Sequence, residues 1–277
     1  MTAILSWFNK ENKSSPYIMT VGDTMISGGE ATLTLEGAKI MELPVKCKDF
    51  TTPIQELYFC SSIGFAYSGS TLVGFNVYCA LQTIFSNLGG LKLHNHLPDY
   101  ISLAKKAEEL LAIYSKAVRS ISELMLFGYC PKLKVPFITT IKPYHTKEGL
   151  KFEIITDTNV SNSNINVSII GDKKEDILNL INAELLERAN GNSVNYWRTP
   201  ALVLKKIVEE NYFTTIGGNL QLATITPHKY ETYSIVDFIK GKEPEGTMKY
   251  RNIDVFEDMG RKVGDCWVSI NGIQIEN

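Results

Sequence analysis

Apolar and polar positions along the chain follow a period that changes several times. Runs rich in β-branched and aromatic residues, which are typical of strands, occupy residues 2–8, 17–21, 33–43 (interrupted at Gly37), 57–67, 133–141, 150–156, 165–170 and 220–226. Apolar residues at helical spacing predict helices over residues 71–87, 98–121, 174–189 and 199 to about 212. The predicted order is a block of strands, two helices, a second block of strands, two helices and a strand.

Local signals set the expected helix ends. Pro98 suits the first turn of the second helix. Asp172 suits a capped start for the third helix, which Gly191 would end. Thr199 and Pro200 form an N-cap and first-turn pair for the fourth helix.

Blocks of strands followed by blocks of helices favour antiparallel sheets with helices packed outside them, rather than a parallel βαβ sheet. Two sheets face to face, each covered by a helix pair, satisfy this order. The predicted fold class is therefore α+β, a four-layer αββα sandwich over residues 1–226. Residues 227–277 are more polar and are predicted to form a C-terminal extension, with a strand at 266–275.

Composition and charge exclude several classes of function. The 277 residues are 44% apolar, which supports one large core or two domains. With 28 basic and 30 acidic residues, the chain shows no basic footprint for nucleic acid or for a membrane surface. The apolar run at 63–85 is broken by polar residues and glycines, which favours a strand, a turn and a helix over a membrane span.

The cysteines and the N-terminal residues indicate a cytoplasmic protein. Five scattered cysteines without a CxxC pair favour reduced thiols over a disulfide framework or a zinc ribbon. Residues 1–13 lack the basic and long apolar segments of a signal peptide.

One acid and one base stand out because each lies at the inner edge of a predicted strand. Asp23 closely follows the strand at 17–21, and Lys39 interrupts the apolar run at 33–43. The residue at the other end of the first predicted hairpin is Thr2. A threonine hydroxyl is a poor nucleophile unless a base lies beside it, so the group that could reach Thr2 decides whether this region is reactive.

Several short segments around these residues occur in a characteristic order. They are TAIL at 2–5, GD at 22–23, AKIMEL at 38–43, GFAYSGS at 64–70, SIIG at 168–171 and IGGNLQ at 216–221. Together they resemble the proteasome β-subunits and their bacterial peptidase relatives, within the N-terminal nucleophile hydrolases. The resemblance covers about residues 2–226, and the spacing of Asp23 and Lys39 is the family's own.

The resemblance implies a hydrolase that uses its N-terminal threonine to cleave peptide bonds. Removal of Met1 would free the Thr2 α-amine, whose reference pKa is about 7.7–8.0, to take the proton of the Thr2 hydroxyl. The Lys39 ammonium would lower the pKa of that amine by charge repulsion. Asp23 would pair with Lys39 and hold it towards Thr2.

Further site residues follow from the same resemblance. Backbone N–H groups of Ser68 and Gly69 would stabilise the oxyanion that forms on the attacked carbonyl. Ser27 and Ser70 would offer backbone atoms to an extended peptide, as an added strand does. Asp172 stands where the family usually has a serine close to the α-amine, and it could replace that serine as an acceptor.

The chain also departs from the family pattern just before its glycine pair. An aspartate and a serine are usual there, whereas this chain has Phe213 and Ile216. The competing interpretation is therefore a catalytically silent ring subunit, and a third is an acylase-type enzyme acting on a small amide. The resemblance implies a homo-oligomeric ring, a peptide or protein substrate, an unidentified unfolding partner, and no metal or cofactor.

Each candidate also has a purely structural explanation. Thr2 could belong to a disordered terminus, and Asp23 with Lys39 could be a structural ion pair. Residues 68–70 could be a tight turn into a helix. His94 and His96 could bind a metal, but no third ligand is near in sequence, which favours a solvated loop.

Overall fold

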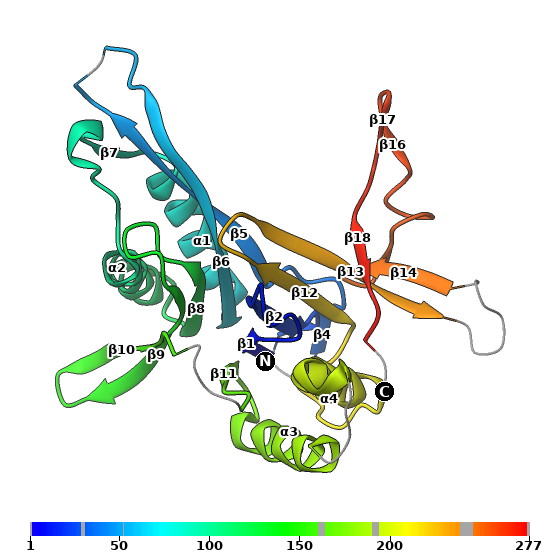
Figure 1. Cartoon of the computed structure of the whole chain (residues 1–277). Helices are drawn as coiled ribbons and strands as arrows, with labels where there is room; N and C mark the ends of the chain where they lie inside the picture. Colours follow the sequence, from blue (N-terminus) through cyan, green and yellow to red (C-terminus); the bar gives the residue numbers. More distant parts are fainter. Residues whose placement is uncertain are drawn as a thin grey trace. The chain divides into compact units, whose positions relative to one another are not determined.

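The computed structural model in Figure 1 describes residues 2–28, 31–51, 53–159, 164–189, 194–238 and 246–275. It is a mixed α/β structure with four α-helices and several sheets in this described part. The chain divides into two compact units. Unit 1 comprises Met1–Ile40, Ile165–Thr224 and Glu231–Asn277, and unit 2 comprises Met41–Asn164 and Ile225–Tyr230.

Unit 1 is built on an eight-stranded sheet with two helices. The sheet order is β11 (Val167–Gly171), β1 (Ala3–Asn9), β2 (Tyr17–Asp23), β12 (Leu220–Ile225), β13 (Tyr230–Phe238), β14 (Gly246–Tyr250) and β15 (Ile253–Asp254), with β18 (Asn271–Ile273) paired to β13. The helices are α3 (Lys174–Arg188) and α4 (Thr199–Glu209), the latter preceded by the 3-10 helix η2 (Val194–Arg198). Two small hairpins complete the unit: β3 (Ile26–Gly28) with β4 (Ala31–Thr34), and β16 (Lys262–Val263) with β17 (Cys266–Trp267).

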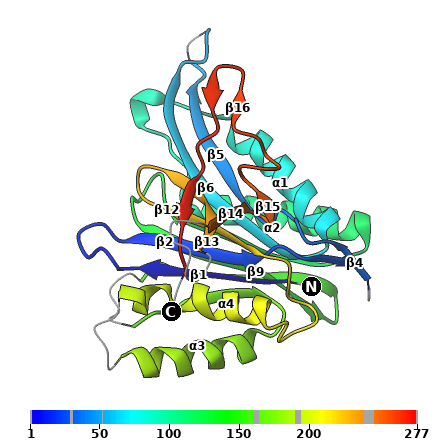
Figure 2. The same ribbon diagram turned by 90° about the vertical axis from the view of Figure 1, so that its right-hand side faces the viewer.

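The core of unit 1 forms where the helices cover β1 and β2, as Figure 2 shows. Alternate residues of a strand share one face, and Leu5 and Trp7 of β1 pack in one cluster with Ile181 of α3 and Leu204 of α4. The Trp7 indole N–H donates to the carbonyl of Trp197 at 2.8 Å. The first hairpin is therefore fixed to η2, directly before α4.

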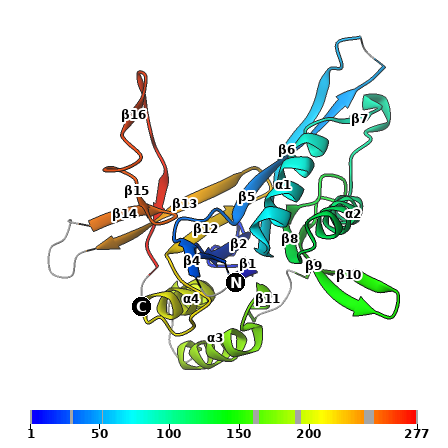
Figure 3. The same ribbon diagram turned by 180° about the vertical axis from the view of Figure 1, so that it is seen from behind.

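Unit 2 is built on a six-stranded sheet with its own helix pair. The sheet order is β10 (Gly149–Asp157), β9 (Pro136–Thr146), β8 (Ser122–Tyr129), β6 (Leu57–Gly69), β5 (Ile40–Asp49) and β7 (Leu88–Gly90). The helices are α1 (Thr71–Phe85) and α2 (Tyr100–Val118), and the short 3-10 helix η1 (Lys92–His94) lies between them in the chain. Figure 3 shows α1 and α2 near β6 and β8.

The core of unit 2 follows the helical spacing seen in the sequence. Val77 and Leu81 of α1 and Ala107 and Leu111 of α2 are fully buried, four residues apart on each helix. They pack against sheet residues such as Phe65 in one cluster. The apolar run at 63–85 is thus the end of a strand followed by a helix, and no described helix has the length and apolarity needed to cross a bilayer.

Three of the expected helix starts are wrong by one or two residues. The second helix begins at Tyr100 with Asp99 as N-cap, so Pro98 lies outside it. The N-cap of the third helix is Lys173 rather than Asp172, and the Asp172 N–H is paired with the Thr2 carbonyl at 2.7 Å. Gly191, the expected end of that helix, lies outside the described residues.

The fourth helix also starts differently from its expected cap. Its N-cap is Arg198, and Thr199 is already helical. The Thr199 hydroxyl donates to the Tyr196 carbonyl at 2.8 Å. The hydroxyl therefore joins α4 to η2.

The strand expected at 33–43 is two strands, β4 and β5, separated around Gly37. The Gly37 N–H donates to the Thr24 carbonyl at 2.8 Å, and a Cβ at Gly37 would come within 2.7 Å of that carbonyl oxygen. This close approach explains the break. Strand β8 was missed because its first residues continue the apolar spacing of the helix expected at 98–121.

We predict that Asp99 stabilises unit 2 through the start of α2. Its carboxylate accepts the Ser102 N–H at 2.8 Å, so Asp99→Ala should lower the free energy of unfolding by about 1 kcal/mol at neutral pH. Asp99→Asn keeps an oxygen that can accept the Ser102 N–H, so its free energy of unfolding should fall by less. Denaturant unfolding of the three proteins measures both changes.

The pH dependence provides a second check on this cap. The Ser102 N–H lowers the pKa of the Asp99 carboxyl, so its charge stabilises the folded state above the ordinary pKa and ceases to do so as the pH falls through the lowered folded-state value. The unfolding free energy of the unmodified protein should therefore exceed that of Asp99→Ala by less below about pH 4. The difference between Asp99→Asn and Asp99→Ala should show no such change with pH. Equal losses for both variants at every pH would contradict the capping role.

Candidate active site

Asp23 and Lys39 form a buried ion pair in unit 1. Asp23 ends β2 and Lys39 directly precedes β5, and their side chains are 0% and 2% exposed. The Lys39 Nζ lies 3.1 Å from Asp23 Oδ1 and also donates to the Met25 carbonyl at 2.5 Å. The side chain of Lys39 is therefore fixed at both partners rather than extending into solvent.

The carboxylate of Asp23 also binds the start of β1. Its Oδ1 accepts the Ala3 N–H at 3.0 Å, and its Oδ2 accepts the Gly217 N–H at 3.2 Å. The Ala3 nitrogen belongs to the peptide bond that joins Thr2 to Ala3. The Lys39 ammonium and this peptide bond therefore meet at one carboxylate oxygen, beside Thr2, which is itself only 5% exposed.

Burial and charge act in opposite directions on this pair. Burial raises the pKa of Asp23, while the Lys39 charge and the N–H groups of Ala3 and Gly217 lower it. Burial lowers the pKa of Lys39, and the Asp23 charge raises it. The attraction between the two charges offsets the free-energy cost of burying each of them.

Gln221 holds the backbone that carries Lys39, a role that the sequence did not reveal. Its Oε1 accepts the N–H groups of Lys39 at 2.9 Å and Ile40 at 3.0 Å, and its amide nitrogen donates to the Ile40 carbonyl. Gln221 is 1% exposed within the apolar strand β12. A buried amide needs partners of this kind, so a glutamine in such a strand was the available signal.

The glycine pair at 217–218 allows a loop to lie against the end of β2. Gly218 has a φ of +81°, and a Cβ there would lie 2.5 Å from Thr24 Oγ1 and 2.8 Å from the Leu35 carbonyl oxygen. The Met25 N–H donates to the Gly217 carbonyl at 3.0 Å. The loop can therefore present the Gly217 N–H to Asp23.

Asp172 and Ser27 also lie in unit 1, in different surroundings. The Asp172 N–H donates to the Thr2 carbonyl at 2.7 Å, in continuation of the pairing of Ala3 with Gly171. Asp172 is half-buried. Ser27 lies in the β3–β4 hairpin opposite Thr32 and is partly exposed.

Ser68, Gly69 and Ser70 lie in unit 2, at the junction of β6 and α1. Ser68 is buried, and Gly69 has a φ of +98° with a Cβ position only 2.6 Å from the Ile121 carbonyl oxygen. Ser70 is the N-cap of α1, and its hydroxyl accepts the Val73 N–H at 3.4 Å. Its own N–H donates to the Ile121 carbonyl at 3.0 Å.

No metal site is formed by the described residues, because no group of three His, Cys, Asp or Glu side chains is arranged to hold an ion. His94 and His96, whose spacing raised the question, have stacked rings with centroids 5.6 Å apart.

Comparison with known proteins supports a fold but no family. The sequence matches no protein-family model and no curated protein. Among solved structures, the chain is similar to Anbu (ancestral beta-subunit) from Yersinia bercovieri, with a TM-score of 0.51, 12% identity and 80% of each chain covered. At this level of identity the likeness concerns the fold alone.

We predict that Lys39→Met lowers the free energy of unfolding by about 3–5 kcal/mol, because it leaves the Asp23 charge buried without its partner. The matched control is Lys92→Met, since the Lys92–Glu56 pair is 50% exposed on both sides and such pairs contribute about 1 kcal/mol or less. Urea denaturation of both variants measures the difference.

The double variant Lys39→Met with Asp23→Asn should recover part of the loss. It removes both charges, and the asparagine oxygen can still accept one of the backbone N–H groups that bind Asp23. Equal stability of the Lys39 and Lys92 single variants would rule out a buried ion pair at this position.

Proposed function

We propose that the chain is an N-terminal-threonine hydrolase of the proteasome β-subunit type, which cleaves peptide bonds after removal of Met1. The observation that carries this proposal is the Asp23 carboxylate, which binds both the Lys39 ammonium and the N–H that follows Thr2. The resemblance of the sequence segments to that family and the structural similarity to a protein described as an ancestral beta-subunit both support it.

In this proposal the Thr2 α-amine is the base. Its reference pKa is about 7.7–8.0, and a neighbouring ammonium disfavours a second positive charge. Lys39, held by Asp23 and by the Met25 carbonyl, would keep the amine neutral near pH 7. The same positive charge would favour the developing Thr2 alkoxide.

The reaction takes two steps. The Thr2 hydroxyl adds to the scissile carbonyl as its proton passes to the α-amine, and the tetrahedral intermediate collapses to an ester as the leaving amine takes that proton. Water, deprotonated by the α-amine, then hydrolyses the ester and restores Thr2. Backbone N–H groups of Ser68 and Gly69 would stabilise the oxyanion, and the loss of one such donor typically costs about 100–1,000-fold in rate.

The remaining parts of the proposal concern substrate and assembly. Ser27 and Ser70 would pair with an extended peptide, and Asp172 would accept from the α-amine. The two units would stack as a four-layer αββα sandwich, since each sheet carries one helix pair. The chain would form a homo-oligomeric ring in the cytoplasm, with an unfolding partner that delivers protein substrates.

A catalytically silent ring subunit is the second candidate. It is favoured by Asp172, Phe213 and Ile216, which replace the family's usual hydrogen-bonding residues near the amine. The Ser70 backbone is also engaged, because its N–H binds the Ile121 carbonyl and its carbonyl accepts the Ser122 hydroxyl at 2.9 Å. An acylase-type hydrolase of small amides would share the Thr2 chemistry and differ only in substrate.

The mass of the natively purified chain is the first test. An active enzyme should lack Met1, so that Thr2 carries the free amine. A fully retained Met1 in a native preparation would contradict the hydrolase and favour the silent subunit, because the amine would then be an amide without basic character.

The second test is a peptide–fluorophore assay with variants of Thr2. Thr2→Ala should abolish turnover, because no nucleophile remains, while Thr2→Ser should retain part of it. Ser14→Ala, in the exposed β1–β2 turn, should leave turnover unchanged. Activity in the Thr2→Ala protein would refute the mechanism, whereas cleavage of small amides without peptides would favour the acylase.

A further inference from the structure

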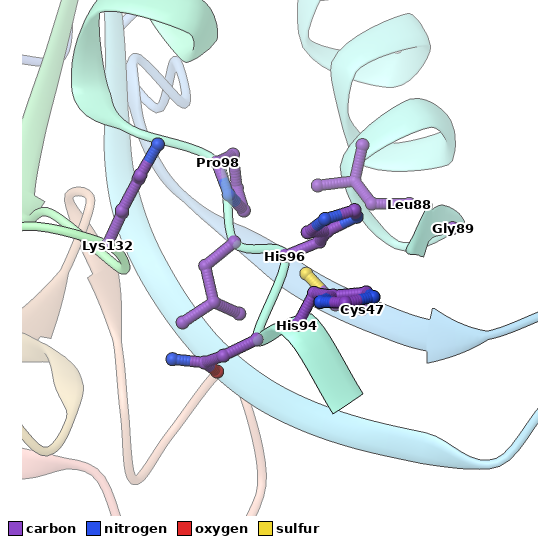
Figure 4. A pocket seen from close by; sticks show the side chains of 9 residues that line it. Cys47, Leu88, Gly89, His94, His96, Pro98 and Lys132 are labelled. Atoms are coloured by element: carbon purple, nitrogen blue, oxygen red, sulfur yellow. The ribbon is translucent and has the colours of Figure 1, made fainter. Parts of the chain in front are cut away.

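Unit 2 contains a pocket of about 380 Å³ that the proposed hydrolysis does not use. Figure 4 shows its lining, which comes from the segment Leu88–Pro98, from Cys47 of β5 and from Lys132, which follows β8. The volume lies in the range of small-molecule sites in proteins, roughly 300–1,000 Å³. The nature of its lining groups indicates which molecules could bind.

The loop that carries the two histidines of this pocket is held in place by neighbouring groups. A Cβ at Gly90 would lie 2.4 Å from the Tyr58 hydroxyl and 2.9 Å from the His96 Cβ, so only glycine permits this approach. The Tyr58 hydroxyl donates to the His96 carbonyl at 2.5 Å. Asn95 between the histidines adopts the left-handed conformation, with a φ of 48°.

This loop conformation brings the two imidazoles together. The rings of His94 and His96 stack with centroids 5.6 Å apart and an angle of 27° between their planes. In Figure 4 they lie one above the other on one side of the pocket, while Lys132 lies on the other side. Each neutral imidazole offers one N–H donor, and the ammonium offers three.

The polar side chains of His94, Asn95, His96 and Lys132 can each donate a hydrogen bond into the pocket, and no carboxylate is among its described lining residues. Lys132 forms no ion pair with the described residues, although its charge, after the hydrogen bonds from Ser102, helps to lower the pKa of Asp99. Cys47 is buried, and burial raises the pKa of its thiol, which disfavours the thiolate form. Leu88, Leu97 and Pro98 supply apolar surface.

A metal ion fits this lining less well than an anion. Zinc sites use three or four protein ligands, whereas no group of three His, Cys, Asp or Glu side chains in the described structure is arranged to hold a metal ion. An anion needs donors and positive charge, which the imidazoles and Lys132 provide.

We infer that this pocket binds a small organic anion. Its carboxylate or phosphate group accepts hydrogen bonds from His94 and His96, and Lys132, whose long side chain can turn towards the ligand, supplies the compensating charge. Its apolar part packs on Leu88, Leu97 and Pro98. The inference is independent of the proposed hydrolase activity, because no residue named for that activity lines the pocket.

The test uses hexanoate and inorganic phosphate as probes of the full-length protein. The chain has four histidines, all of them exposed, so carbethoxylation followed by peptide mass analysis reports on each one. Hexanoate should slow the modification of His94 and His96, and this protection should reach a plateau. The hexanoate concentration that gives half of the protection should equal the dissociation constant measured by calorimetry. His145 and His228 serve as internal references and should react at unchanged rates.

Variants test the role of charge and of the apolar lining. Lys132→Met should weaken hexanoate binding about tenfold or more, as expected for the loss of a charged partner. Lys134→Met is the matched control, because Lys134 does not line the pocket. Its Nζ lies 5.0 Å from the centroid of the Phe59 ring. Phosphate, which lacks an apolar part, should bind more weakly than hexanoate.

Four results would overturn the inference. They are no protection of His94 and His96 by millimolar hexanoate, equal protection of all four histidines, unchanged binding in Lys132→Met, and phosphate binding as tight as that of hexanoate. Protection by micromolar Zn²⁺ with no effect of hexanoate would instead establish a metal site.

Discussion

The arrangement of unit 1 depends on one carboxylate that has no contact with water. Asp23 accepts from the Lys39 ammonium and from the N–H groups of Ala3 and Gly217, so three segments far apart in the chain converge on two oxygen atoms. A buried carboxylate without such donors would be strongly destabilising. The same requirement that stabilises this charge therefore fixes where β1 begins, and with it the position of Thr2.

Glycine backbone and one glutamine make this convergence possible. Gly218 adopts a left-handed conformation and lies so close to Thr24 that a side chain would not fit. Gln221 forms hydrogen bonds with the backbone N–H groups of Lys39 and Ile40 and with the Ile40 carbonyl. These two residues supply the close packing and hydrogen bonding that keep a lysine and an aspartate in one orientation in the interior.

The sequence predicted the elements whose signal is local. The helices α1 and α3 and the strands of the first hairpin follow from periodicity, whereas the pairing of Asp23 with Lys39 was expected from the family resemblance. The role of Gln221 did not follow from the sequence, because its partners lie far away in the chain. Strand β8 was missed because its first residues continue the apolar spacing of the helix expected at 98–121. The start of α4 was misplaced at Thr199, whose hydroxyl donates to the Tyr196 carbonyl. The start of α3 was misplaced at Asp172, whose N–H continues the pairing of β1 with β11.

Gln221 has a consequence for biosynthesis, because 182 positions separate it from the Lys39 nitrogen that it binds. A ribosome makes the lysine long before it makes the glutamine, and contacts of such wide sequence separation form late in folding. The emerging N-terminal half therefore carries its charged pair without the strand that immobilises it. The backbone that carries Lys39 therefore gains its glutamine partner only after most of the polypeptide has been synthesised.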